Sequence, residues 1–299
     1  YRPFVDPINL MELFVLDSQN LYIAGEYGYI LRSTNGGDSW IKQNIGSGYS
    51  FSSLLFRNVD TGFAGGKNNV IVRTTNGGIS WQMVHVFNGT GNEWIRKIFF
   101  ADNLTGYALN SIGQIYKSTN GGVSWSGLPR FAEERFNNIL FSDASNGIIL
   151  GYFGELYRTS DGGNSWALTN TGTTESFFDV KQISPNFLVA SATNGVIARS
   201  SDFGRNWSFF NTGLAESFTS IYFTDVNNGF GFSHSFKLFK TSDGGLTWSQ
   251  TPDMPPSYIP TAMAGSTDGT IFLTCRLNKV LKYNSAFQWQ EVRLQAAPS

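Results

Sequence analysis

An eight-residue pattern recurs through the chain and ends each time in tryptophan. The first copy is Ser33-Thr34-Asn35-Gly36-Gly37-Asp38-Ser39-Trp40, and similar copies end at Trp81, Trp125, Trp166, Trp207 and Trp248. A degraded copy ends at Trp289, and successive tryptophans lie 41, 44, 41, 41, 41 and 41 residues apart. A fixed period of this length indicates a repeat architecture in which each copy is one supersecondary unit.

Each repeat has the pattern of four short strands, which we name A to D in chain order. In the second repeat, strands are expected at residues 51–56, 62–66, 70–75 and 80–84, separated by turns rich in Gly, Asn and Asp. Connections this short require antiparallel hairpins, and a lone four-stranded meander leaves both faces exposed. Radial stacking of seven meanders buries these faces. The sequence therefore predicts an all-β, seven-bladed β-propeller with four antiparallel strands per blade and the octapeptide in most C–D turns.

The register also predicts the domain organisation. We expect one propeller at residues 10–294, an N-terminal extension at 1–9 and a tail or linker at 295–299. The expected blades are approximately 10–45, 46–88, 89–130, 131–170, 171–211, 212–252 and 253–294. Because the first and last repeats each contain all four strands, we expect no strand exchange between the termini, unless residues 1–5 add an edge strand. The first residues lack Met and the last resemble a linker, so we expect a processed chain or a piece of a larger protein.

Composition argues against several classes of function. The chain of 299 residues carries 21 basic and 22 acidic residues, a formal net charge of −1, so nucleic acid is not the expected partner. Cys275 is the only cysteine, which excludes an intrachain disulfide and a cysteine-based metal site. No apolar run approaches 18 residues, so we expect no transmembrane span. We expect no cofactor, no metal site and no catalytic residue.

Counting back from each tryptophan predicts structural roles. The residue 30 positions earlier is apolar and expected in the core between blades: Leu10, Phe51, Ile95, Phe136, Phe177, Phe218 and Ile259. The residue 23 positions earlier is expected to cap the A–B turn rather than to act as a catalytic acid: Asp17, Asn58, Asp102, Asp143, Ser184, Asp225 and Ser266. The residue 12 positions earlier is suited to positive φ in the B–C hairpin: Gly28, Asn69, Gly113, Gly154 and Gly195.

The octapeptide itself is expected to be structural. Its third residue can accept backbone N–H groups within the turn, and its tryptophan can anchor the turn by burying a large side chain. The residues assigned this role are Asn35, Trp40, Asn76, Trp81, Asn120, Trp125, Asp161, Trp166, Asp202, Trp207, Asp243 and Trp248.

The pattern Ser/Thr-x-Asp/Asn-x-Gly-x-Ser/Thr-Trp resembles the Asp-box, or BNR, repeat. Residues 56–65 and 223–231 add an aromatic strand end, a short Asp/Asn turn and then Gly-aromatic-small, which resembles the photosystem II assembly-factor-like propellers. That resemblance implies a seven-bladed, non-enzymatic scaffold outside the cytoplasm of a bacterium: secreted, periplasmic or on the cell surface. Members from photosynthetic organisms carry an arginine-rich patch, whereas the arginines of this chain are scattered, which argues against a photosynthetic role.

Two other families with Asp-boxes provide the alternative, a glycan-binding or glycoside hydrolase propeller. Sialidases have six blades, an Arg-Ile-Pro motif and an arginine triad, whereas residues 1–3 here are Tyr-Arg-Pro. Xyloglucanases pair two propellers around a cleft with two catalytic Asp residues. In that alternative, Asp179 and Glu12 would supply the carboxylates.

A partner is expected on the face formed by the D–A and B–C loops, because these loops vary while the opposite turns repeat. Aromatic and arginine side chains are frequent interface anchors. The candidates are Trp94, Arg96, Lys97, Arg130, Phe131, Arg135, Tyr152, Phe153 and Tyr258, and the B–C loops add Tyr27, His234 and Arg276. There are two alternatives to this interpretation. In one, Trp94 covers the edge of the core. In the other, Arg96 and Lys97 pair with Glu12, Asn138 and Asp179, which hold equivalent places in other repeats. The expected partner is a protein segment or a surface glycan, bound by a monomeric propeller.

Overall fold

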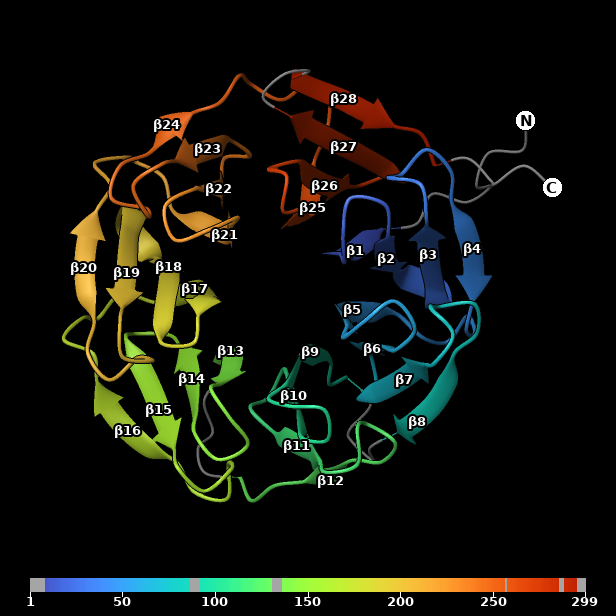
Figure 1. The fold of residues 1–299 in the computed structure, drawn as a ribbon, viewed down its shortest axis with the longest axis horizontal. Coiled ribbons are helices and arrows are strands. Elements are labelled where there is room, and N and C mark those ends of the chain that lie inside the picture. Colours follow the sequence, from blue (N-terminus) through green and yellow to red (C-terminus); the bar gives the residue numbers. More distant parts are fainter. Residues whose placement is uncertain (1–8, 87–91, 131–135, 256, 285–287, 295–299) are drawn as a thin grey trace. The chain divides into compact units, whose positions relative to one another are not determined.

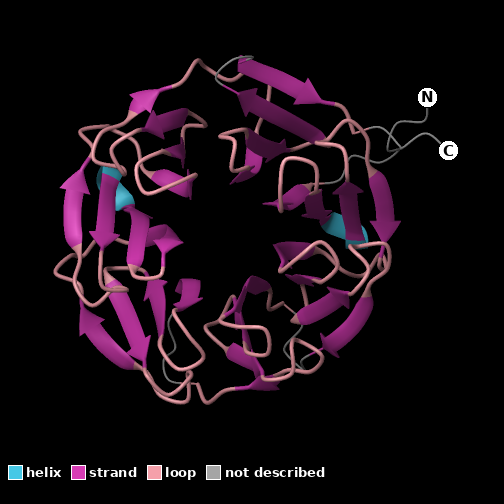
Figure 2. Cartoon of the chain, viewed as in Figure 1, coloured by secondary structure: helices cyan, strands magenta, loops and turns pink. Residues whose placement is uncertain are grey.

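The computed structural model describes residues 9–86, 92–130, 136–255, 257–284 and 288–294. These residues form an all-β, seven-bladed propeller of seven four-stranded antiparallel sheets (Figure 1). Helical structure in the described residues is limited to two short 3-10 turns, Glu26–Gly28 and Thr193–Gly195 (Figure 2). Accordingly, no helix among them has the length and apolar character needed to cross a membrane. The chain divides into two compact units, Tyr1–Ile98 with Met254–Ser299, and Phe99–Asp253, which are described separately.

The first unit contains the first, second and seventh sheets. The first is β1 (Leu10–Val15), β2 (Leu21–Gly25), β3 (Tyr29–Ser33) and β4 (Ile41–Asn44). The second is β5 (Phe51–Phe56), β6 (Gly62–Gly66), β7 (Val70–Thr74) and β8 (Gln82–Val86). The seventh is β25 (Pro260–Gly265), β26 (Ile271–Cys275), β27 (Lys279–Asn284) and β28 (Gln288–Val292). The first and last sheets thus each use four consecutive strands, as the register predicts.

The second unit contains the fourth, fifth and sixth sheets and most of the third. The third is β9 (Ile95–Phe100), β10 (Gly106–Asn110), β11 (Ile115–Ser118) and β12 (Ser126–Gly127). The fourth is β13 (Phe136–Phe141), β14 (Gly147–Gly151), β15 (Glu155–Thr159) and β16 (Ala167–Asn170). The fifth is β17 (Phe177–Ser184), β18 (Phe187–Ala192), β19 (Val196–Ser200) and β20 (Ser208–Asn211). The sixth is β21 (Phe218–Phe223), β22 (Gly229–Ser233), β23 (Leu238–Thr241) and β24 (Ser249–Gln250).

Burial falls from the second strand of each sheet to the fourth. Strands β2, β6, β10, β14 and β26 are buried along their whole length, whereas β12, β16 and β24 are mainly exposed. The apolar clusters join consecutive sheets rather than single ones. In the first unit, Leu10 and Leu21 pack with Phe272 and Val280, so the last blade contacts the first. In the second unit, Leu150 and Phe177 belong to one such cluster.

A glycine at the start of strand B explains the Gly-aromatic motif of the repeat. A Cβ added to Gly62 would lie 2.5 Å from the Phe56 ring, and one added to Gly229 would lie 2.6 Å from Phe223. The space is taken because each ring folds over the strand and meets the octapeptide tryptophan edge-on. Ring centroids are 5.8 Å apart for Phe56–Trp81 and 6.2 Å for Phe223–Trp248. Such edge-to-face pairs stabilise beyond their area burial.

In six blades the octapeptide lies between the third and fourth strands and has one hydrogen-bond pattern. In the first copy, Ser33 Oγ accepts the Gly37 N–H at 2.9 Å and Asn35 Oδ1 accepts the Ser39 N–H at 3.0 Å. Trp40 is 1% exposed, and its Nε1 donates to the Gly37 carbonyl at 3.0 Å. The two bonds of the turn recur in all six copies. The indole ring is buried in the first, third and sixth blades and half-buried in the second, fourth and fifth.

The A–B and B–C turns match the register in most blades. The five Asp and Asn residues expected as A–B caps each accept two backbone N–H groups of their turn; Asp17, for example, accepts those of Gln19 and Asn20. The five residues expected at positive φ in the B–C hairpin all have it. The prediction is wrong for Ser184, which continues β17, and for Ser266, where Asp268 accepts the Thr270 N–H instead.

Ile259 was also predicted incorrectly as core. Its side chain is 42% exposed, and Pro260 is buried at the place that Leu10 holds in the first blade. The cause is a shortened seventh octapeptide. Ser33 and Tyr283 hold equivalent pairing positions, yet Trp40 follows seven residues after the first and Trp289 six after the second. Counting back from Trp289 therefore misses by one residue.

The burial of Trp40 predicts how much this side chain contributes to the free energy of unfolding. Replacing Trp40 by Ala should lower the free energy of unfolding by roughly 3–5 kcal/mol, because a fully buried ring leaves a cavity. Trp40→Phe keeps most of the ring and loses the bond to Gly37, so about 1 kcal/mol is expected. Urea denaturation of both variants measures the difference. Equal losses for the two would show that the hydrogen bond, rather than burial, anchors the turn.

The acidic octapeptides predict sensitivity to acid. Hydrogen bonds from the Ser165 hydroxyl and backbone, and from Thr159, lower the pKa of Asp161 from 3.8 to about 2. A lowered folded-state pKa stabilises the fold above pH 4, and this contribution is lost as the pH falls through 2. Asp161→Asn, the residue found in the first three copies, should therefore flatten the fall in unfolding free energy between pH 4 and pH 2. An unchanged slope in urea melts over this range would contradict the assignment.

Candidate functional site

The B–C turns hold bulky residues in a backbone conformation that favours Asn or Gly. In five blades two successive residues have positive φ: Tyr27–Gly28, Asn68–Asn69, Phe153–Gly154, Asn194–Gly195 and Leu277–Asn278. This is the geometry of a two-residue type I′ hairpin, whose first position favours Asn, Asp or Gly. The second and fifth blades have Asn there, whereas the first, fourth and seventh have Tyr27, Phe153 and Leu277. Placing such residues at positive φ costs about 1–3 kcal/mol each.

Those bulky side chains point into solvent. Phe153 is 79% exposed, Leu277 70% and Tyr27 54%. Among the described residues, the strongly exposed aromatic side chains all lie in B–C turns, the others being Tyr152 and Phe236. The A–B and C–D turns also expose apolar residues, but these are aliphatic, such as Val59, Ile79 and Val123. In the part of the chain that the structure describes, the aromatic residues with the most exposed side chains thus lie in B–C turns.

The Tyr152–Phe153 turn of the fourth blade has a rigid base. The two ring centroids are 6.5 Å apart. The Phe153 N–H donates to Ser176 Oγ at 3.0 Å, which ties the turn to the following D–A loop. A Cβ on Gly154 would lie 1.9 Å from the Thr173 carbonyl oxygen, so the loop packs directly against the turn. Both rings are therefore presented from a fixed backbone.

Trp94 lies in the first unit and is only half-exposed. It forms an isolated antiparallel bridge with Lys67 of the preceding B–C turn, and Ile95 beside it is fully buried. This position favours the alternative in which Trp94 covers the edge of the core. Arg96 is exposed and Lys97 half-buried on the same strand, β9.

Arg130 and Tyr258 are both engaged by their own blades. Arg130 is exposed, and its Nη2 donates to the carbonyl of Ile112 at 2.9 Å. Tyr258 Oη donates to Glu291 Oε2 at 2.6 Å, and the carboxylate raises the pKa of Tyr258 to about 12. Lys279 pairs with the same carboxylate. The predicted residues Phe131 and Arg135 lie outside the described residues.

Polar side chains at one position of strand A link neighbouring blades. Ser53 Oγ accepts the Ile98 N–H at 3.2 Å, and Asn138 Nδ2 donates to the Phe178 carbonyl at 3.1 Å. Asp179 Oδ2 accepts the Ile221 N–H at 3.0 Å. Lys97 and Glu12 hold the same register position on their own strands. In three blades, then, this position connects sheets.

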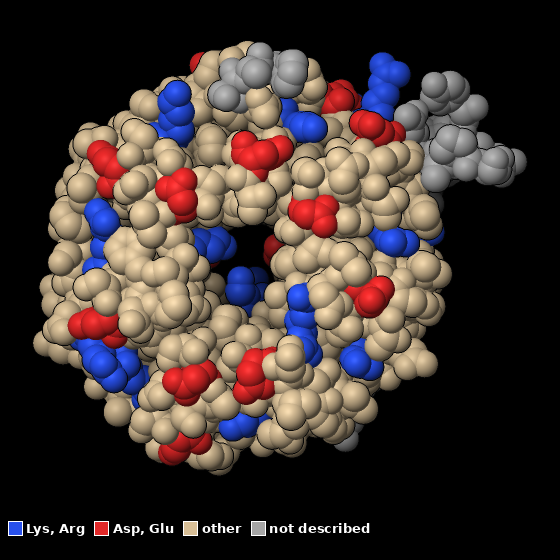
Figure 3. Space-filling view, in the orientation of Figure 1, with Lys and Arg blue, Asp and Glu red and all other residues tan. Residues whose placement is uncertain are grey.

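The sequence pattern missed Phe236 and Leu277. Tyr27, Asn68, Phe153 and Asn194 all lie 13 residues before an octapeptide tryptophan, so a bulky apolar residue at that offset is a signal for an exposed side chain in a B–C turn. Phe236 lies 12 residues before Trp248, so this signal does not find it. Leu277 escapes it because the seventh octapeptide is one residue short. Figure 3 shows acidic and basic side chains scattered among uncharged ones on the face in view.

Comparison with known proteins supports the resemblance seen in the repeat. Residues 5–132 match a family model described as the photosynthesis system II assembly factor YCF48. The predicted resemblance is confirmed. A solved structure of YCF48 bound to D1 peptide has a TM-score of 0.76 at 20% identity, covering 95% of this chain and 98% of that one. YCF48 from Cyanidioschyzon merolae gives 0.75 at 16% identity, with the same coverage.

Glycoside hydrolases share the fold over part of their length. The GH74 xyloglucanase from Xanthomonas campestris has a TM-score of 0.64 at 15% identity, covering 97% of this chain and 54% of that chain. No curated protein sequence matches the chain. At these identities the structural likenesses establish the propeller fold, which YCF48 and GH74 share.

Strain at Phe153 predicts that removing it stabilises the protein. Phe153→Asn should raise the free energy of unfolding by about 1 kcal/mol, because Asn tolerates positive φ far better. Phe153→Ala removes the same exposed ring but keeps a side chain that disfavours this conformation, so no such gain is expected. Urea denaturation compares the two. A gain shared equally by Ala would show that the ring, rather than the backbone, is the source of strain.

Proposed function

We propose that this protein is a non-enzymatic interaction scaffold that binds a segment of a protein partner through the apolar B–C turns. We further propose that it works outside the cytoplasm of a bacterium, as a secreted, periplasmic or surface protein. The observation that carries the proposal is that, among the described residues, the most exposed aromatic side chains lie in B–C turns, several of them at strained backbone positions. The location is supported by the resemblance of the repeats.

The energetics of these turns favour a binding role. A ring such as Phe153 gains nothing from the fold that would offset its backbone strain, because most of its surface faces water. Strain of this kind persists where surrounding structure enforces it, and it gathers at ligand-binding positions. Burial on a partner would return about 25 cal/mol per Å² of apolar surface. Aromatic anchors on a rigid base also lose little side-chain freedom on binding.

A peptide segment is the kind of partner that the similar structures support. One of them is described as YCF48 bound to D1 peptide, so a propeller of this fold can bind a peptide. Segments of this kind bind through a few side chains in sequence, which matches paired rings such as Tyr152 and Phe153.

Asp179 argues against the hydrolase alternative. Its carboxylate accepts the backbone N–H groups of Val180 and Ile221, and Lys181 Nζ lies 3.0 Å away. A catalytic acid or nucleophile needs oxygen atoms directed at a substrate. These contacts give Asp179 a structural task between two blades instead.

Site-specific photo-crosslinking in whole cells tests the proposal. A photoreactive residue at Phe153 should give a discrete adduct with another protein, recovered from the envelope or the secreted fraction. The matched control is Val123, which is 54% exposed in an octapeptide turn of the same unit. Adducts at Val123 alone, equal adducts at both positions, or adducts only with cytoplasmic proteins would refute it.

A further inference from the structure

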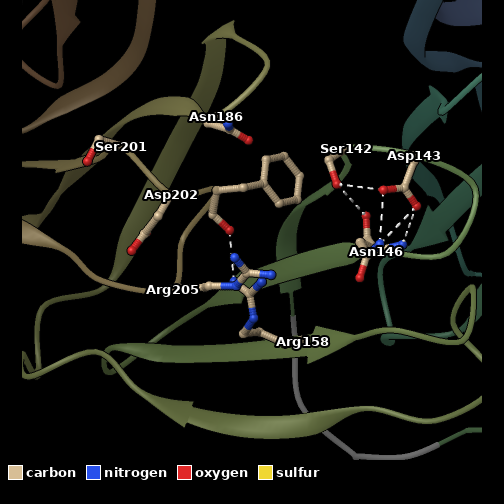
Figure 4. Close-up of a pocket in the computed structure, with 9 residues that line it drawn as sticks. Ser142, Asp143, Asn146, Arg158, Asn186, Ser201, Asp202 and Arg205 are labelled. Atoms are coloured by element: carbon tan, nitrogen blue, oxygen red, sulfur yellow. Dashed lines mark hydrogen bonds between the residues drawn. The ribbon is translucent and has the colours of Figure 1, made fainter.

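A cavity of about 310 Å³ lies between the fourth and fifth blades, on the side of the A–B and C–D turns. Its walls come from the A–B turn after β13, from Arg158 on β15 and from the octapeptide of the fifth blade (Figure 4). All of these belong to the second unit. The sequence predicts a binding site on the opposite face, that of the D–A and B–C loops, and not on this side.

Arg158 belongs to a recurring clamp between blades. In the third blade, Lys117 Nζ donates to the Gly162 carbonyl of the next octapeptide at 2.9 Å. Arg158, at the equivalent place in the fourth blade, donates from Nη1 to the Phe203 carbonyl at 2.8 Å. A guanidinium has five N–H donors, so this bond leaves the others available. This contact between blades explains why a basic residue occupies position 158, but it uses only one of the N–H groups of Arg158.

Two departures from the repeat line this cavity, and a third lies beside Arg158 on the neighbouring strand. Arg205 stands where the other intact octapeptides have Asp38, Ile79, Val123, Asn164 and Leu246. Phe203 replaces the first glycine of the turn and is held at φ 54°. Ile148 in the fourth blade holds the position that Tyr107 holds in the third. The Tyr107 hydroxyl donates a hydrogen bond to the carbonyl oxygen of Gly162, in the next octapeptide, at 3.2 Å. The fourth blade lacks that hydroxyl, and the fifth adds a second cation.

The guanidinium groups of Arg158 and Arg205 lie close together at the wall of this cavity (Figure 4). Burial, and then the charge of Arg205, lower the pKa of Arg158. Among the described residues neither arginine forms an ion pair. Asp202 is occupied in its own turn, where it accepts the Asn206 N–H at 2.9 Å and Asn206 Nδ2 at 2.7 Å. Asp143 likewise accepts the N–H groups of Ser145 and Asn146. Both carboxylates keep their negative charge, and that of Asp202 acts on Arg158, but their oxygen atoms are engaged within their own turns, so the remaining N–H donors of the two guanidinium groups are left for the cavity.

We propose that this cavity binds a carboxylate group, held between the guanidinium groups of Arg158 and Arg205. Forked guanidinium donors match a carboxylate in bidentate geometry. Ser201 and Asn186 also line the cavity and carry neutral donors. The Asp143 and Asp202 carboxylates at its wall oppose a doubly charged phosphate more strongly than a singly charged carboxylate. The ligand is thus a small molecule or a chain end with one free carboxylate.

NMR titration of the full chain tests the site with three probes: N-acetylglycine, its neutral amide and inorganic phosphate. N-acetylglycine should shift the backbone amides of residues 201–206 to saturation, and the amide should not. Arg205→Leu should weaken binding at least about tenfold, since a charge-assisted hydrogen-bonded pair is lost. This variant is expected to fold, because Leu246 occupies the same position in the next octapeptide.

The matched control is Arg293→Leu, which changes the net charge equally at an exposed residue outside the cavity. It should bind N-acetylglycine like the parent chain. Equal shifts with the amide, an unchanged dissociation constant for Arg205→Leu, or equal weakening by Arg293→Leu would overturn the site. Tighter saturation by phosphate would overturn the choice of carboxylate.

Discussion

Each sheet of this protein has two apolar faces, and only packing between sheets removes both from water. Strands such as β6 and β14 are buried along their length because neighbouring blades lie against them. Gly65 shows how tight this contact is, since a Cβ there would lie 2.5 Å from Ile95 of the next blade. A blade therefore has no independent stability, and the repeat period reflects the length of chain needed to form one such sheet.

Polar contacts then fix how one blade meets the next. The octapeptide forms hydrogen bonds within its own turn. One of its backbone carbonyl groups remains and accepts a hydrogen bond from a basic side chain of the preceding blade, as the Gly162 carbonyl does from Lys117 Nζ. Strand A adds side-chain bonds such as Asn138 to Phe178. These contacts have directions that apolar packing lacks, so they specify the offset between sheets. The same residues that resemble catalytic or ligand-binding groups in the sequence, including Asp179, have structural tasks of this kind.

Much of the fold could be predicted because it depends on local chemistry that recurs. Asp17 and Asn58 cap turns in the same way, and Gly28 and Asn69 adopt positive φ at the same offset. Prediction failed where the spacing of the repeat changed. The seventh octapeptide is one residue shorter than the others, so Pro260 rather than Ile259 is buried in the core. The candidate site was only partly foreseeable. Side-chain exposure and the half-buried bridge of Trp94 depend on contacts between blades, which no periodicity encodes.

Departures from the repeat fall into two physical kinds, and the distinction separates structure from function. Some raise the free energy of unfolding, as Asn does at the first position of the B–C hairpins in the second and fifth blades. Others lower it, as with Phe153, whose exposed ring gains no burial that would offset its positive φ. Selection for stability alone would remove the second kind, because Asn occupies the same position in the second and fifth blades. Costly departures therefore identify the surfaces on which a task other than folding has been imposed.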